Sequence, residues 1–338
     1  MANSLLVTGA AGFIGSAFVR HWCRTYPEDT VIAYDALTYA GTLSNLAEVK
    51  DEIIFVQGDI QDQELVSRLL KEHRITTVVN FAAESHNSYA ILNPMKFFSS
   101  NVMGPVALLE AVRNNGSGDI RFHQISTCEV YGDMELDSED AFTPESAYRP
   151  RTPYNAAKAG GDHAVRVYGM TYGIPVTITN CSNNYGPYQF PEKVIPLFVT
   201  NALRGKKLPV YESSRNRREW LHVEDHCRAI DLVLRRGRIG ETYHVGSAVE
   251  ADVDQLVEVV LNELGLDRDI IQVVPDRPSH DRRYLLDSSK IRRELGWEPL
   301  VAFDKGLRET INWYRDNPQW WEPLLGRSPV SEEIAWLR

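Results

Sequence analysis

The 338-residue sequence lacks any apolar run that approaches the roughly 20 residues needed to cross a membrane. Its opening, MANSLLVTGAAGFIG, also lacks a basic segment followed by an apolar core, because it runs directly into a strand pattern and a glycine-rich turn. We therefore expect a soluble, cytoplasmic protein with no membrane partner.

Paired cysteines and concentrated positive charge are absent as well. The four cysteines, Cys23, Cys128, Cys181 and Cys227, form neither a CxxC pair nor another metal-ligand spacing, so we expect no disulfide and no metal. The formal net charge is −10, whereas nucleic acids bind to concentrated positive charge. We therefore expect no nucleic acid partner, and an anionic substrate must meet a few local arginines.

Short β-branched segments alternate with helical patterns over the first half of the chain. The segments are 4–8, 31–34, 53–56, 77–80, 121–126 and 176–180. Between the first two, Ile14, Phe18 and Trp22 recur at every fourth position, which is typical of the buried stripe of a helix. Alternation of this kind predicts an α/β fold with a Rossmann-type, doubly wound parallel sheet.

A glycine-rich turn lies between the first strand and the first helix. Gly9, Gly12 and Gly15 in TGAAGFIG let the backbone approach a pyrophosphate, whose charge then lies at the helix N-terminus. Asp35 ends the second strand, where a carboxylate can bind a ribose 2′-hydroxyl and would repel a 2′-phosphate. The pattern predicts NAD as the cofactor. Asp59, after the third strand, is either an adenine contact or a loop cap.

The alternation of strands and helices breaks after about residue 183, where proline and aromatic residues become frequent. Helical patterns return at 224–236, 252–264 and 304–315, and no Gly/Ser-rich linker separates them. We predict an NAD-binding domain over residues 1–183 and a smaller substrate-binding lobe over 184–338, interleaved with the edge of the sheet.

A catalytic pattern follows the fifth segment. Tyr154 and Lys158 in TPYNAAK stand four residues apart, so that a helix would place both on one face. A nearby ammonium lowers the pKa of a tyrosine, which can then take a proton from a sugar hydroxyl while hydride leaves for NAD. Thr127 ends the preceding strand, at the sheet edge where ligands bind. Together the three predict a dehydrogenase site.

These motifs resemble those of the extended short-chain dehydrogenases and, within them, of the dTDP-glucose 4,6-dehydratases. The resemblance extends over roughly residues 4–322 and rests on TGAAGFIGS, YDALTYAG, GDI, FAAESH, SNNYGPYQFPEK, VEDHCRAIDLVL, DRPSHDRRY and IRRELGWEP. It implies an enzyme that oxidises C4 of a nucleotide-diphosphate hexose, eliminates water across C5 and C6, and returns the hydride. It also implies a homodimer through a helix pair at about 101–115 and 152–170.

The resemblance assigns roles to individual residues. It implies that Thr127, Tyr154 and Lys158 oxidise C4 and that Glu129 removes the C5 proton. Cofactor contacts are implied at Gly9, Gly12, Phe13, Ile14, Gly15, Asp35, Leu37, Thr38, Asp59, Ile60, Ala82, Ala83, Ser85, Ser100, Tyr154 and Lys158. Substrate contacts are implied at Ser85, His86, Thr127, Asn183, Lys193, Arg218, Arg277 and His280.

The sequence departs from the family pattern near the sugar. Cys128 replaces the aspartic acid that protonates the departing C6 hydroxyl, and Asn87, Ser88 and Tyr89 replace Val-Asp-Arg. We expect Cys128 to be either the proton donor or a small packing residue. The alternative reactions are a 5,6-dehydration that returns hydride to C4 and leaves an exocyclic 5,6-ene, and a C4 epimerisation, against which Glu129 argues. A non-catalytic NAD-binding protein is the alternative from another class.

Overall fold

The first strand shows how the sheet is built. In the computed structural model, which describes residues 3–116 and 118–330, Leu5 and Val7 pack on one face of the sheet and Leu6 packs on the other. Successive side chains of a strand point to opposite faces, so a strand that is apolar throughout must be covered by helices on both faces. The predicted doubly wound parallel sheet is confirmed.

The main sheet has seven parallel strands. In sheet order they are β10 (Thr242–Val245), β6 (Val176–Cys181), β5 (Arg121–Thr127), β4 (Thr77–Asn80), β1 (Ser4–Thr8), β2 (Thr30–Asp35) and β3 (Ile54–Gln57). The six predicted strands form, each within about a residue of its predicted bounds. The seventh, β10, comes from the second half of the chain and pairs with β6.

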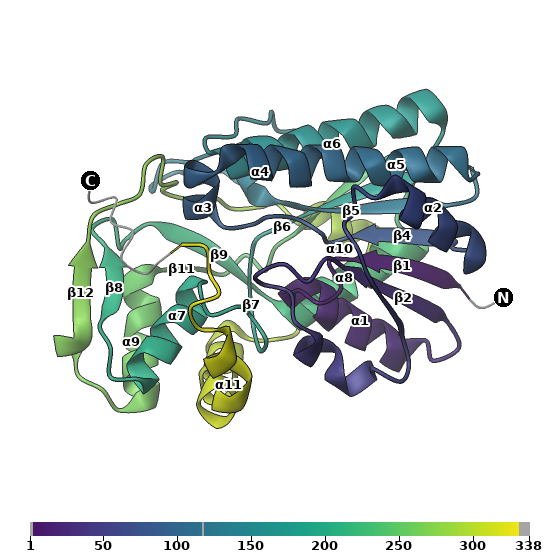
Figure 1. The fold of residues 1–338 in the computed structure, drawn as a ribbon. Coiled ribbons are helices and arrows are strands. Elements are labelled where there is room, and N and C mark those ends of the chain that lie inside the picture. The colour runs from purple at the N-terminus through teal and green to yellow at the C-terminus, as the bar shows by residue number, and fades with distance from the viewer. Residues whose placement is uncertain (1–2, 117, 331–338) are drawn as a thin grey trace.

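Helices cover both faces of this sheet (Figure 1). One face carries α1 (Phe13–Thr25), η1 (Leu43–Val49), α8 (Val223–Arg236) and α10 (Ser289–Leu295), and the other carries α2 (Gln63–Glu72), α5 (Gly104–Asn114) and α6 (Pro153–Tyr172). The predicted stripe of α1 is buried at Phe18 and Trp22. The short segments α3 (Asn87–Leu92), α4 (Pro94–Phe98) and the π-helical η2 (Ser99–Met103) lead from β4 into α5.

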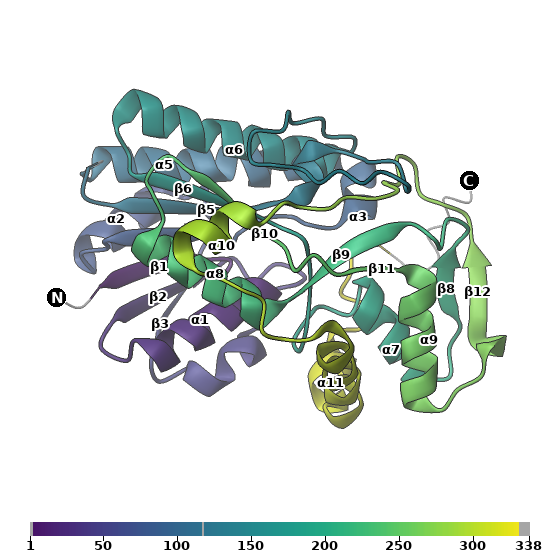
Figure 2. The ribbon, with the colours of Figure 1, turned by 180° about the vertical axis from the view of Figure 1, so that it is seen from behind.

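A smaller lobe lies beside the carboxyl ends of the strands (Figures 1 and 2). Its strands are β7 (Asn183–Tyr185), β9 (Arg217–His222) and β11 (Glu250–Asp252) in one sheet, and β8 (Leu208–Tyr211) and β12 (Ile271–Val274) in another. Its helices are α7 (Val194–Leu203), α9 (Val253–Leu264), α11 (Phe303–Asp316) and α12 (Pro318–Trp321). The remaining short 3-10 turns are η3 (Cys128–Tyr131), η4 (Arg268–Ile270) and η5 (Glu322–Leu324). No helix in the described residues is long and apolar enough to cross a membrane.

A buried carboxylate on β9 binds two other segments of the chain, the loop before β11 and the segment after β12. Glu219 on β9 accepts hydrogen bonds from the backbone N–H groups of Ala248, at 2.7 Å, and Leu286, at 3.2 Å. Burial raises the pKa of Glu219 from 4.5 to about 7. The folded protein therefore holds a proton that the unfolded chain releases, so this group contributes most stability below about pH 4.5 and loses the contribution as the pH rises through about 7.

Replacing Glu219 with Gln should remove this pH dependence. The difference in unfolding free energy between wild type and Glu219→Gln should fall by about 2–3 kcal/mol from pH 5 to pH 8, as measured by urea unfolding. Glu72→Gln, at an exposed position at the end of α2, is the matched control and should give a nearly constant difference. A constant difference for Glu219→Gln would contradict the prediction.

Candidate active site

The site forms where the parallel strands end. β1 and β4 are paired in register, and at their ends the Thr8 hydroxyl donates to Oδ1 of Asn80 at 2.6 Å. β5 ends at Thr127 in the same sheet, next to Cys181 of β6. The carboxyl ends of parallel strands meet at one edge, so the glycine turn, the loop after β4 and η3 all start there.

The glycine turn approaches the loop after β4 closely. Gly9 has a φ of +64°, and a Cβ there would lie 2.6 Å from the backbone nitrogen of Ala82. A Cβ on Gly15 would collide with the carbonyl oxygen of Gly9. Gly12 caps α1, which begins at Phe13 and continues with Ile14, so the helix N-terminus opens at the turn. Such a backbone surface fits a pyrophosphate.

Asp35 connects this turn to the loop after β2. Its carboxylate accepts hydrogen bonds from the backbone N–H of Ala11, at 2.9 Å, and of Leu37, at 2.7 Å. Burial raises the pKa of Asp35, although both hydrogen bonds oppose the shift. The carboxylate therefore lies where the glycine turn meets the loop that contains Leu37 and Thr38, which is the place predicted for a ribose contact.

The other predicted cofactor residues surround the same edge. Asp59 Oδ1 accepts a hydrogen bond from the Gln61 N–H at 2.9 Å, so Asp59 acts as a loop cap, and Ile60 follows it. Ala82 and Ala83 follow β4, and the Ala82 N–H donates to the Thr8 hydroxyl. Ser100 lies in η2 on the same side of the sheet as α5.

The predicted triad comes together from β5 and α6. Thr152 caps α6 through a hydrogen bond from the Asn155 N–H, and Tyr154 and Lys158 follow as buried residues one turn apart. The Lys158 ammonium donates to the carbonyl of Ile125 on β5 at 2.6 Å. The Thr127 side chain lies near Tyr154 and acts to lower its pKa. The three side chains thus lie together.

The predicted lowering of the Tyr154 pKa is wrong for this structure. Burial raises the pKa of Tyr154 well above its usual range, the nearby carboxylate of Glu129 adds to the shift, and the Thr127 side chain opposes it. Burial also lowers the pKa of Lys158. The cost of removing the phenolate from water is therefore larger than the opposing effect of Thr127.

Asp162 is a partner of Lys158 that the sequence analysis missed. It is fully buried one turn after Lys158, and its Oδ2 accepts hydrogen bonds from Ser126, at 2.5 Å, and Tyr148, at 3.0 Å. Its charge raises the pKa of Lys158 against the effect of burial. The sequence could have indicated this contact, because the four-residue spacing from Lys158 to Asp162 places both residues on one face of a helix.

Cys128 and Glu129 lie in η3, directly after Thr127. Glu129 is half-buried, and its Oε2 accepts a hydrogen bond from Asn87 Nδ2 at 2.9 Å. Cys128 is buried against a cluster that includes Ala159 and Tyr284. Burial raises the pKa of the Cys128 thiol well above its usual range, so the thiol keeps its proton at neutral pH.

Cationic groups gather between the loop after β4 and the start of α7. The Lys193 ammonium donates to the carbonyl of Ser85 at 2.7 Å. Burial, with the charges of Lys193 and Arg277, lowers the pKa of His86 to about 3, so His86 is neutral. Arg277 Nη1 is buried and has no hydrogen-bond partner among the described residues. This free donor fits a phosphate oxygen.

The remaining predicted substrate residues lie around the segment that contains Tyr284. Arg218 donates to the carbonyls of Asp281 and Arg282, and its guanidinium lies 4.8 Å from the centre of the Tyr284 ring. The Tyr284 hydroxyl donates to Asn183 Oδ1 at 2.6 Å. His280 Nδ1 lies 3.1 Å from Asp276. The structure thus brings Asn183 and Arg218 together through Tyr284.

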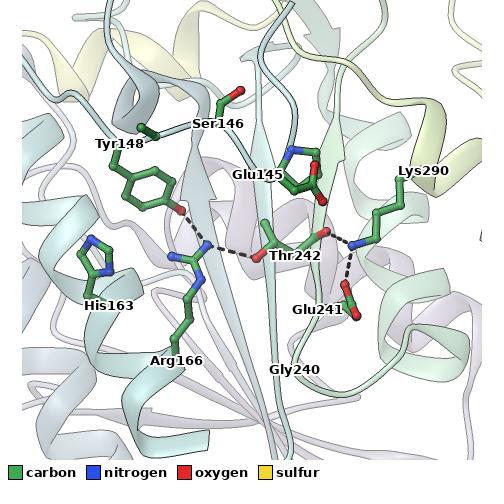
Figure 3. A pocket seen from close by; sticks show the side chains of 11 residues that line it. Glu145, Ser146, Tyr148, His163, Arg166, Gly240, Glu241, Thr242 and Lys290 are labelled. Atoms are coloured by element: carbon green, nitrogen blue, oxygen red, sulfur yellow. Dashed lines mark hydrogen bonds and ion pairs between the residues drawn. The ribbon is translucent and has the colours of Figure 1, made fainter. Parts of the chain in front are cut away.

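A separate pocket of about 540 Å³ opens between α6, β10 and α10 (Figure 3). Its cationic side chains are paired, since Arg166 donates to Tyr148 and Thr242 while Lys290 binds Glu241. None of the predicted catalytic or binding residues lines it. We therefore locate the candidate active site at the carboxyl edge of the sheet and not in this pocket.

Comparisons with known proteins show the family of the chain. Residues 6–310 match the family model described as GDP-mannose 4,6 dehydratase. A dTDP-glucose 4,6-dehydratase from Mycobacterium tuberculosis is 50% identical, with 95% of this chain and 96% of that protein aligned.

Two solved dTDP-glucose 4,6-dehydratases, both with NAD bound, share the fold. The protein from Streptomyces venezuelae is 48% identical with a TM-score of 0.91, covering 95% of this chain and 99% of that one. The protein from Bacillus anthracis is 45% identical with a TM-score of 0.89, covering 96% and 100%. The chain belongs to the GDP-mannose 4,6 dehydratase family of extended short-chain dehydrogenases.

Proposed function

We propose that this chain is an NAD-dependent nucleotide-sugar 4,6-dehydratase that acts on a nucleotide-diphosphate hexose such as dTDP-glucose. The observation that carries the proposal is the convergence of Thr127, Glu129, Tyr154 and Lys158 from β5, η3 and α6 at the carboxyl edge of the sheet. The dTDP-glucose 4,6-dehydratases that resemble this chain over almost its whole length support the choice of reaction.

The residues at the edge of the sheet fit NAD. A Cβ at Gly9 or Gly15 would fill the turn, and Asp35 lies beside it. Gly12, Phe13 and Ile14 would face the pyrophosphate from the N-terminus of α1. Asp35 would bind the adenosine ribose and disfavour a 2′-phosphate. When bound, NAD supplies the acceptor and later the donor of the hydride.

The triad prepares C4 for oxidation. Thr127 and Tyr154 lie near each other, so both hydroxyls can hold the oxygen at C4. Tyr154 takes the proton of that hydroxyl. Tyr154 is the phenolate before this transfer and the neutral phenol after it. Lys158, anchored to Ile125 and charged with the help of Asp162, stabilises the phenolate that takes the proton.

Glu129 and Cys128 serve the elimination. A C4 ketone acidifies the C5 proton, which Glu129 removes, and the electron pair of the C5–H bond becomes the C5–C6 double bond. The C6–O bond breaks, and the hydroxyl leaves as water after it takes a proton from the protonated Cys128 thiol. When hydride is returned at C6, Glu129 gives its proton back to C5. The proton that Tyr154 removed then restores the Cys128 thiol and leaves Tyr154 as the phenolate. A C4 epimerase needs no such base.

We propose that Lys193, Arg277 and Arg218 form the cationic side of the substrate site, which binds the anionic diphosphate. The free buried donor of Arg277 is directed to a diphosphate, and neutral His86 adds a hydrogen-bonding group without charge. We retain the division into an NAD-binding domain over 1–183 and a substrate-binding lobe over 184–338, with β10 as the strand that interleaves them.

We also propose a homodimer through the helices that cover one face of the sheet. Three of these elements, α4, η2 and α6, carry exposed apolar side chains: Met95 at 75% exposure, Met103 at 54% and Met170 at 78%. These helices lie side by side on the outside of the molecule (Figure 1). Apolar side chains concentrated on one surface are typical of an interface.

Light scattering should give about twice the 38.3 kDa mass of one chain. Met170→Glu together with Met103→Glu should give a monomer, because charge at the centre of an apolar interface is costly to bury. Leu300→Glu is the control, since Leu300 is 73% exposed and distant in the sequence from these helices. A monomeric wild type would contradict the proposal.

The reaction is tested by incubating the protein with dTDP-, UDP- and GDP-hexoses and identifying the products by mass and NMR. We expect loss of one water and a new C6 methyl group, with dTDP-glucose as substrate and no net accumulation of NADH, because hydride is returned in each turnover. Isomerisation without loss of water would indicate an epimerase instead. No turnover on any hexose would support the non-catalytic alternative.

The second candidate function is a 5,6-dehydratase, and it is suggested by Cys128 at the position of the expected aspartic acid. If the thiol is the C6 proton donor, Cys128→Ala should slow dehydration by roughly 10²-fold without weakening NAD binding. Cys128→Asp should retain activity and, if the wild type forms a 5,6-ene, shift the product toward the 4-keto-6-deoxy sugar. Steady-state kinetics and NMR of the products measure both effects. Unchanged turnover and product in the Ala variant would leave Cys128 as a packing residue.

A further inference from the structure

Asn87 contacts two parts of the active site at once. It is the first residue of α3, and its Nδ2 donates to Glu129 Oε2 at 2.9 Å. Its Oδ1 accepts a hydrogen bond from the Thr152 hydroxyl at 2.8 Å. The single amide therefore joins the base for elimination, on η3, to the first turn of the helix that carries Tyr154 and Lys158.

Thr152 determines which way the amide faces. Its Oγ1 already accepts the N–H of Asn155 at the cap of α6, so its one hydroxyl proton is available for the oxygen of Asn87. Reversing the amide would place Oδ1 against the Glu129 carboxylate, where two acceptors face each other. The buried cap of α6 thus directs the donor side of Asn87 to Glu129.

The bond from Asn87 leaves one oxygen of Glu129 for chemistry. Oε2 is held by a donor, and Oε1 accepts no hydrogen bond from the part of the chain that the structure describes. A donor to an ionised carboxylate makes a strong, short hydrogen bond that fixes the carboxylate plane. A carboxylate base that is held in one orientation points its free oxygen at the reacting proton for a larger fraction of the time.

We propose that Asn87 is a positioning residue for the elimination step, in which it holds the Glu129 carboxylate so that Oε1 meets the C5 proton. The inference rests on the proposed dehydratase function. Asn87 is one of the three residues that replace Val-Asp-Arg of the family pattern, and a valine at this position has no donor for Glu129.

The test separates oxidation from elimination. After rapid mixing with dTDP-glucose, absorbance of enzyme-bound NADH rises with oxidation at C4 and decays as elimination proceeds and hydride returns. Asn87→Asp keeps the side-chain shape and the bond with Thr152 but replaces the donor with a like charge. We expect NADH to form within about twofold of the wild-type rate and to decay roughly 10- to 100-fold more slowly.

Three further variants make the result specific. Glu129→Gln should form enzyme-bound NADH that does not decay, because elimination is blocked. The NADH trace of Asn87→Asp should resemble this trace. Asn87→Val, which lacks both polar atoms, should slow the decay by about tenfold. Asn262→Asp, an equal change of charge at an exposed position on α9, should match the wild type. Exchange of the C5 hydrogen with deuterated solvent should slow in parallel with the NADH decay.

Several outcomes would overturn the inference. Decay of NADH at the wild-type rate in Asn87→Asp would show that the contact does not matter. Failure to form NADH in both Asn87 variants, with normal NAD binding, would show that Asn87 supports the whole site and not the base. A wild type that converts no nucleotide-hexose would instead reject the proposed function, and it would do so before any variant is compared.

Discussion

The site depends on the parallel pairing of β1, β4, β5 and β6. Because these strands run in one direction and in register, the residues that follow them meet at one edge without any covalent link. Thr8 and Asn80 are joined there by a side-chain hydrogen bond, and the carbonyl of Thr127 accepts another from Asn180. The pairing of the strands therefore positions the residues at their ends, and the loops add further side chains to the same site.

Burial is the second constraint, and it controls the charges. Tyr154, Lys158 and Asp162 are all buried, so each pays to ionise, and the groups that lower this cost are their immediate partners. The same effect keeps the Cys128 thiol protonated and His86 neutral. Burial is therefore the largest influence on the protonation state of these groups, and their immediate partners modify it.

Much of the fold was predictable because its signals are local. A buried parallel strand needs an apolar run, and a tight strand-to-helix turn needs glycine, so six strands and the turn at Gly9 could be located from the sequence alone. The Tyr154 and Lys158 pair has helical spacing for the same reason. β10 was not predicted, because a four-residue strand that joins a distant edge carries little local pattern.

The contacts that sequence analysis missed connect distant segments. Asn87, Glu129 and Thr152 are separated by more than 20 residues from one another, and nothing in the spacing of Asn87 indicates its partners. The raised pKa of Tyr154 follows from burial, which depends on how α6 packs on the sheet. Asp162 is the one missed contact that the sequence could have indicated, since its four-residue spacing from Lys158 places both residues on the same face of α6.

The pairing of β10 with β6 also bears on how the chain is made. During synthesis β6 leaves the ribosome about sixty residues before β10, so for several seconds at typical elongation rates its outer edge has no strand to bond with. An open edge is a template for pairing with other chains. The nascent chain is therefore open to misassembly and to chaperone capture along the edge of β6 in this interval, which ends when β10 pairs with β6.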